Sequence, residues 1–120
     1  MARVLIVDDD EDIRDTTALR LRMLGHDVVA VDDAATARDA GARFDVAVVD
    51  IHMPGTDGIT LLHQLRAQPG TAGLPIIFYT AHWSASVAAE AAPLADVYLT
   101  KNQPMSRLVQ AIDELAGRPG

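Results

Sequence analysis

The residues with the clearest chemical potential are three aspartates, Asp8, Asp9 and Asp50. Each follows a short apolar run rich in β-branched residues, Val4 to Val7 before the first pair and Val46 to Val49 before the third. Such runs are typical of strands buried on both faces of a parallel sheet. Open α/β sheets bind their ligands beyond the carboxyl ends of the strands, so carboxylates there can meet a substrate.

Three neighbouring carboxylates cannot all stay ionised without a compensating cation. Oxygen ligands favour a hard divalent ion, and Mg²⁺ with several retained waters fits best. The acidic run continues through Asp10, Glu11 and Asp12, where a helix N-terminus by itself explains the negative charge. The sequence therefore predicts a magnesium site on Asp8, Asp9 and Asp50.

Two more polar residues end predicted strands. Thr80 ends the fourth strand, and Lys101, the only lysine beside nine arginines, ends the fifth. A carboxylate nucleophile, a metal, an ammonium and a hydroxyl suit phosphoryl transfer onto Asp50. Lys101 and the metal would neutralise the phosphoryl oxygens, and Thr80 would donate a hydrogen bond to them.

The elements that must position these residues alternate along the chain. We expect strands at 3–7, 27–31, 45–49, 75–80 and 96–100. We expect helices at 13–24, at 34–42, from 59 through 65, at 83–92 and from near Pro104. Asp33 would cap the second of these helices. The last would bury a stripe of Met105, Leu108, Val109, Ile112 and Leu115. This order predicts an α/β fold, a flavodoxin-like five-stranded parallel sheet in the order 2-1-3-4-5 with five helices on both faces. Strands one and three are then neighbours, which brings Asp8, Asp9 and Asp50 together.

Composition restricts the functional classes. The 120 residues, 49% hydrophobic and 22% charged, can form one core, so we expect a single domain over 1–120 with 117–120 as a tail or the start of a linker. A net charge of −7 argues against direct binding to nucleic acid or to an anionic membrane. Without cysteine there is no disulfide and no thiolate site. The first apolar run is too short for a signal peptide, and we expect a cytoplasmic protein.

Several motifs together resemble the receiver domains of two-component response regulators, and the resemblance covers nearly the whole chain. They are Val7-Asp8-Asp9, Val49-Asp50, Met53-Pro54, Asp57-Gly58, Thr80-Ala81 and Tyr98-Leu99-Thr100-Lys101.

The resemblance implies roles for individual residues. Asp50 would be the phosphoacceptor, Asp9 and Asp50 direct Mg²⁺ ligands, Asp8 a ligand through water, and the backbone carbonyl of His52 a further ligand. Thr80 and Tyr98 would form the switch pair.

The resemblance also implies partners. The phosphodonor would be a sensor histidine kinase or a phosphotransfer protein, and the output face would be the fourth helix, fifth strand and fifth helix, with homodimerisation left open. The chain would be no enzyme beyond Mg²⁺-dependent self-phosphorylation and slow autodephosphorylation.

The chain departs from the family at the residue after the lysine, where Asn102 replaces the usual proline. A cis bond before an ordinary residue costs roughly 2.5–4 kcal/mol, so we predict a trans Lys101–Asn102 bond, a reshaped loop, and a lysine stem that still reaches Asp50.

The histidines divide into two groups. His52 and His82 stand where the family tunes phosphoryl lifetime, and we expect a long-lived phosphoryl-Asp50, or alternatively capture of Zn²⁺ or Cu²⁺. His26 and His63 are expected to be plain surface residues.

Two alternatives come from other classes. One is a Mg²⁺-dependent phosphohydrolase with an aspartyl-phosphate intermediate, in which Asp8 and Asp10 would form the Asp-x-Asp pair. The other is a receiver-like interaction module that is never phosphorylated, although the joint presence of Asp8, Asp9, Asp50, Thr80 and Lys101 argues against it.

Overall fold

Five parallel strands form one sheet in the order β2-β1-β3-β4-β5, which confirms the predicted topology. The structure is a computed structural model that describes residues 2–40, 43–50, 57–81 and 84–117. Within these ranges the strands are β1 Arg3–Val7, β2 Asp27–Val31, β3 Val46–Val49, β4 Ile76–Thr80 and β5 Val97–Thr100. The central strands β1, β3 and β4 are buried on both faces, apart from Arg3 at the start of β1, as their continuous apolar runs predict.

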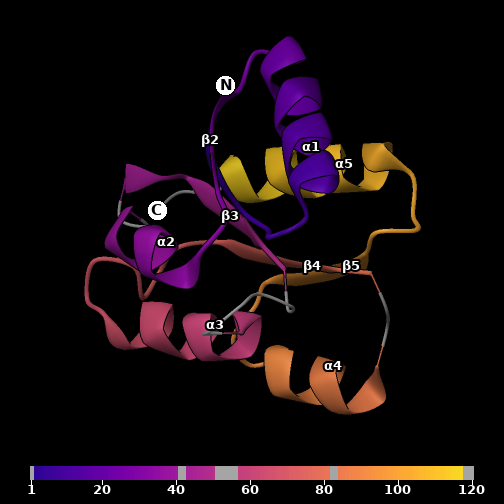
Figure 1. Ribbon diagram of the computed structural model, residues 1–120. Helices are drawn as coiled ribbons and strands as arrows, with labels where there is room; N and C mark the ends of the chain where they lie inside the picture. Colours follow the sequence, from indigo (N-terminus) through magenta and orange to yellow (C-terminus); the bar gives the residue numbers. More distant parts are fainter. Residues whose placement is uncertain (1, 41–42, 51–56, 82–83, 118–120) are drawn as a thin grey trace.

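Helices cover both faces of the sheet (Figure 1). In the described ranges they are α1 Glu11–Met23, α2 Ala34–Ala40, α3 Gly58–Ala67, α4 Ala85–Ala91 and α5 Met105–Ala116. Alternate strand residues build two cores: Val4 and Ile6 pack on the side of α1 and α5, whereas Leu5 and Val7 pack on the side of α2, α3 and α4. None of these helices is long and apolar enough to span a membrane.

The helix boundaries differ by one or two residues from the predicted ones. Helix α1 begins two residues earlier than its apolar periodicity suggested, because Asp10 caps it by accepting a hydrogen bond from the Ile13 N–H at 3.2 Å. Pro104 stands just before the first residue of α5 instead of within it. Helix α4 starts at Ala85, two residues after the predicted start, and position 83 lies outside the described residues, as do 41 and 42 after α2.

The amino-terminal edge of the sheet is held by side chains that bond to the backbone. The Arg66 guanidinium of α3 donates to the carbonyl oxygens of Ala72, Leu74 and Leu94 at 2.6–3.0 Å and pairs with Asp96 at 3.2 Å. Asp96 in turn accepts the N–H of Ile76 at 2.8 Å. Loops that precede β4 and β5 are therefore tied to one helix.

The prediction for His26 was wrong. Its side chain is only 9% exposed. The ring Nδ1 accepts the Ala2 N–H at 3.1 Å, and Nε2 lies 3.4 Å from a carboxylate oxygen of Asp113 on α5. Because Nδ1 accepts a hydrogen bond, the ring N–H is on Nε2. His63 on α3 is exposed, as predicted.

Candidate functional site

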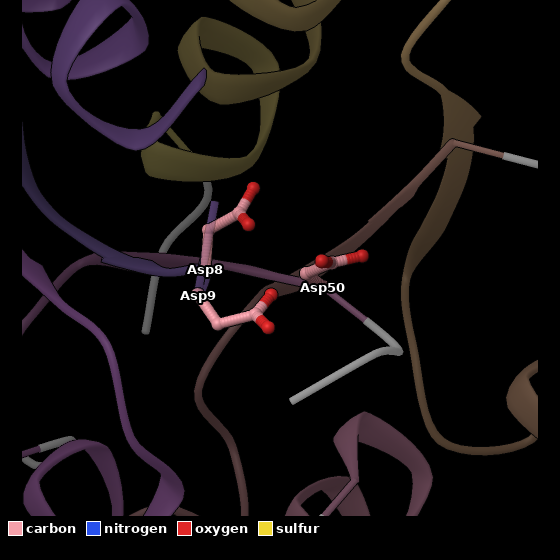
Figure 2. A group of neighbouring side chains, drawn as sticks. All are labelled: Asp8, Asp9 and Asp50. Atoms are coloured by element: carbon pink, nitrogen blue, oxygen red, sulfur yellow. The ribbon is translucent and has the colours of Figure 1, made fainter. Parts of the chain in front are cut away.

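Three carboxylates meet at the carboxyl ends of β1 and β3. Asp8 and Asp9 follow β1, Asp50 follows β3, and each of the three offers an oxygen within 4.8 Å of the others. Figure 2 shows the Asp9 carboxylate extending toward Asp50, with Asp8 beside it. The parallel ladder fixes this arrangement, since the Asp50 N–H donates to the Val7 carbonyl at 2.9 Å. The predicted convergence is confirmed.

Lys101 enters the same group from the end of β5. Its Nζ lies 2.7 Å from Oδ2 of Asp8 and 3.4 Å from Oδ2 of Asp50, and its side chain is 9% exposed. The backbone N–H of Lys101 donates to the Thr80 carbonyl at 2.7 Å, which anchors the start of the following loop on β4. The lysine ammonium therefore neutralises part of the carboxylate charge.

Charge remains unbalanced at Asp50. Its side chain is largely buried, and Oδ1 has no hydrogen-bond partner among the described residues. Burial of the carboxyl and, next, the negative charge of Asp8 raise the pKa of Asp50 to about 6, although the Lys101 ammonium lowers it. Burial lowers the pKa of Lys101, but its hydrogen bond to Asp8 and the two carboxylate charges outweigh burial and raise that pKa above its usual range.

These features fit a divalent cation. The exposed Asp9 carboxylate lies near Asp50, whose buried Oδ1 has no partner in the described part of the chain, and all the donor atoms are hard oxygens. A second positive charge would relieve the crowding that a single lysine leaves. The ligand chemistry of Asp8, Asp9 and Asp50 is thus compatible with Mg²⁺ binding.

The acidic residues that follow Asp9 belong to the start of helix α1 instead of the carboxylate cluster. Asp10 caps α1, and Glu11 and Asp12 lie in the first turn of that helix, where negative charge is favourable. The backbone N–H of Asp10 donates to Oδ1 of Asp8, whereas its own carboxylate turns to the helix. An Asp-x-Asp pair of Asp8 and Asp10 therefore gains no support from the geometry.

Thr80 and Tyr98 lie on neighbouring strands. Thr80 ends β4 and is fully buried. Tyr98 of β5 packs inward, its ring 5.6 Å from that of Phe78 in an edge-to-face contact, and its hydroxyl is buried without a partner among the described residues. Burying a hydroxyl without a hydrogen-bond partner costs free energy. A second side-chain orientation of Tyr98, with its hydroxyl bonded elsewhere, would therefore be close in energy.

The loop after Lys101 has no cis bond, so the predicted trans Lys101–Asn102 bond is confirmed. The Thr100 hydroxyl donates to the Asn102 side-chain carbonyl at 2.5 Å, and the Gln103 N–H donates to the Thr100 carbonyl at 3.2 Å. Lys101 reaches both carboxylates from this backbone, as its long stem allows.

One neighbour of the site was missed by the sequence reasoning. The Lys101 ammonium lies 5.9 Å from the ring centroid of Tyr79, a residue that reads as an ordinary core position of β4. Only side-chain alternation could have indicated it, because Tyr79 pairs with Leu99 in the parallel register and Lys101 falls two residues later on the same face. His52 and His82 lie outside the described residues, so the backbone ligand and the lifetime residues stay predictions.

Sequence comparison gives a consistent result. Residues 4–113 match the family model of the response regulator receiver domain. The transcriptional regulatory protein FixJ of Bradyrhizobium diazoefficiens is 36% identical over 113 residues, which are 92% of this chain and 54% of FixJ. PrrA of Mycobacterium tuberculosis, a transcriptional regulatory protein, is 37% identical over 98% of this chain and 51% of its own length. The chain spans about half the length of these curated relatives.

Solved structures agree with the sequence matches. The receiver domain of the Francisella response regulator 1452 superposes with a TM-score of 0.87 at 30% identity, over 97% of both chains. The response regulator TrrA of Thermotoga maritima, solved in complex with Mg²⁺-BeF, has a TM-score of 0.85 at 25% identity, over 96% of this chain and 99% of TrrA.

Proposed function

Because the chain belongs to the response regulator receiver family and is a receiver domain of two-component signalling, we propose that Asp50 is its phosphoacceptor. The observation that carries the proposal is the meeting of three carboxylates with one ammonium, Lys101 Nζ lying 3.4 Å from Asp50. These are the groups that phosphoryl transfer to a carboxylate requires.

The transfer uses a phosphohistidine donor on a sensor kinase or a phosphotransfer protein. The Asp50 carboxylate attacks phosphorus, the P–N bond to the donor imidazole breaks, and an acyl phosphate forms on Asp50. Lys101 then pairs with a phosphoryl oxygen, and the Thr80 hydroxyl donates to another. Asp50 and Lys101 are held by backbone bonds to neighbouring strands, so little reorganisation is needed.

Asp9 and Asp50 hold Mg²⁺ directly, and Asp8 holds it through water. The chemistry that the ion supplies when bound is neutralisation of the phosphoryl oxygens. Asp8 already pairs with Lys101 at 2.7 Å, which supports an indirect role for its carboxylate. The His52 carbonyl completes the proposed ligand set.

Output passes through α4, β5 and α5. Tyr98 lines a hollow of about 430 Å³ between α4 and β5, next to alanines of α4. Movement of Thr80 toward a phosphoryl group would change the packing beside Tyr98, whose hydroxyl is not held by a hydrogen bond from any residue that the structure describes. The receiver unit over 1–120 would act in the cytoplasm, where it would meet its kinase, and its catalysis would be limited to its own phosphorylation and slow dephosphorylation.

Acetyl phosphate with Mg²⁺ tests the acceptor. Intact mass should increase by one phosphoryl group, and Asp50→Asn should abolish the increase. Asp57→Asn is the matched control, because Asp57 caps α3 through the Thr60 N–H at 2.8 Å and an asparagine can still cap. Labelling that persists in Asp50→Asn would refute the proposal, whereas an unlabelled but folded wild-type protein would favour the non-phosphorylated module.

Phosphoryl lifetime depends on His52 and His82 in this proposal. Two imidazoles beside the phosphoryl group would crowd the attacking water, so replacing His52 with Met and His82 with Ala should hasten phosphoryl loss. Unchanged or slower loss would exclude the crowding. Tight Zn²⁺ or Cu²⁺ binding that the double variant loses would instead support metal capture.

A further inference from the structure

The Lys101 side chain borders two different regions of the structure. In one, its ammonium contacts Asp8 and Asp50 at 2.7 and 3.4 Å. In the other lies a hollow of about 280 Å³ between α1 and α5, which Lys101 also lines. A flexible four-carbon stem can serve either direction, so a neighbouring group that restricts the stem would add to the two ion pairs in keeping the ammonium at the site.

The hollow also contains a carboxylate that can attract a cation. Asp12 of α1 lines it together with Thr16, Thr17 and Met105. An ammonium turned into this space would meet the Asp12 carboxylate in a more open setting and would lose Asp50. The site therefore faces a competing carboxylate on the neighbouring helix.

Tyr79 lies beside both the Lys101 ammonium and this hollow. The residue is 7% exposed, it lines the hollow, and its ring centroid is 5.9 Å from the Lys101 ammonium. An aromatic face at this distance attracts a cation, and the ring forms part of the wall of the hollow that Lys101 also lines. Burial raises the pKa of Tyr79, so the phenol stays neutral and its ring keeps an electron-rich face.

We propose that Tyr79 is a positioning residue for Lys101, holding the ammonium at Asp8 and Asp50 and away from Asp12. The expected consequence, a change in the rate of phosphorylation, rests on the proposed function. The contact itself is independent of that function.

Paired variants of Tyr79 test the proposal. Tyr79→Phe keeps the ring and should leave the rate of phosphorylation by acetyl phosphate within about twofold of wild type. Tyr79→Leu keeps an apolar side chain without the aromatic face and should lower the rate by about threefold to tenfold. Phe44→Leu is the control, because it removes the ring under Arg3 at the opposite edge of the sheet, and it should not change the rate.

A rescue separates positioning from loss of structure. Adding Asp12→Asn to Tyr79→Leu removes the competing carboxylate and should restore most of the rate. Rate loss in Tyr79→Phe, no loss in Tyr79→Leu, or a loss that Asp12→Asn fails to restore would each overturn the proposal.

A second measurement does not depend on phosphorylation. Lys101 is the only lysine, so acylation of its amine by an N-hydroxysuccinimide ester can be followed by peptide mass. Acylation should be faster in Tyr79→Leu than in wild type and unchanged in Tyr79→Phe. Equal rates in all three proteins would overturn the positioning role even if Asp50 is phosphorylated, and failure of Asp50 to label would overturn the proposed function alone.

Discussion

The two edges of the sheet use charge in opposite ways. At the amino-terminal edge, charged side chains bond to the backbone: Arg66 bonds to three carbonyl oxygens and pairs with Asp96, and Asp45 accepts the Arg3 N–H at 2.8 Å. At the carboxyl-terminal edge, three carboxylates meet, Lys101 pairs with Asp8 and Asp50, and a buried oxygen of Asp50 has no partner among the described residues. The amino-terminal edge therefore stabilises the fold, whereas the carboxyl-terminal edge carries excess negative charge that can bind a cation.

This difference has a physical basis. A buried carboxylate without full compensation costs free energy, which the rest of the fold must offset. The same imbalance makes the edge a receptor for a cation and for a phosphoryl group with its metal. Variants at the two edges should therefore change stability with opposite signs.

The largest effect is expected at Arg66. Arg66→Met removes one donor from each of three carbonyl oxygens and breaks the ion pair with Asp96, and should lower the free energy of unfolding by about 2–4 kcal/mol. Urea unfolding measures it, and Mg²⁺ affinity should stay unchanged. Arg38→Met is the matched control: its guanidinium pairs with exposed Asp39 at 3.5 Å, and its loss should change stability by less than about 0.5 kcal/mol. Equal losses would show that the Arg66 bonds add little.

The opposite sign is expected at Asp50. The pKa of about 6 lies above the usual 3.8, so the folded state binds this proton more tightly than the unfolded state. The contribution of Asp50 therefore favours folding below pH 4 and is lost as pH rises through 6.

Without Mg²⁺ at pH 8, Asp50→Asn should raise the free energy of unfolding by about 1–2 kcal/mol, and the gain should shrink toward pH 4. Asp45→Asn, at the other edge, should not stabilise. A gain that is independent of pH would mean that ionisation of Asp50 is not its cause.

Magnesium should remove part of the contrast between the edges. At ten times its dissociation constant, Mg²⁺ should raise the free energy of unfolding of wild type by about 1.4 kcal/mol. Asp9→Ala should abolish this increase and the heat of Mg²⁺ binding in calorimetry, whereas Asp12→Ala should leave both nearly unchanged. If the two variants lose equally, the acidic run binds cations diffusely.

The smallest effect is expected at His26, again on the amino-terminal edge. His26→Leu removes the acceptor of the Ala2 N–H, and should lower the free energy of unfolding by about 1 kcal/mol. His63→Leu on exposed α3 should stay within about 0.5 kcal/mol of wild type. Thermal unfolding at pH 8 compares them, and the idea fails if His63→Leu costs as much as His26→Leu.

The sequence by itself determined the sheet and the place of its site. Alternating strand and helix signals, with right-handed crossovers, leave few topologies, and a parallel sheet gathers its strand ends at one edge. Asp8, Asp9, Asp50 and Lys101 could therefore be predicted to meet from their positions after apolar runs. Even the trans bond after Lys101 followed from local chemistry.

Only the tertiary structure decided which partner each side chain takes. Lys101 lies closer to Asp8 than to Asp50, Tyr79 packs beside its ammonium, and His26 bonds to Ala2 and approaches Asp113. These contacts join residues more than 20 positions apart, and they depend on rotamers and on packing between elements. Periodicity predicts which face of a helix or strand a side chain occupies, but not which residue it contacts there. These contacts could therefore not be predicted from the sequence pattern.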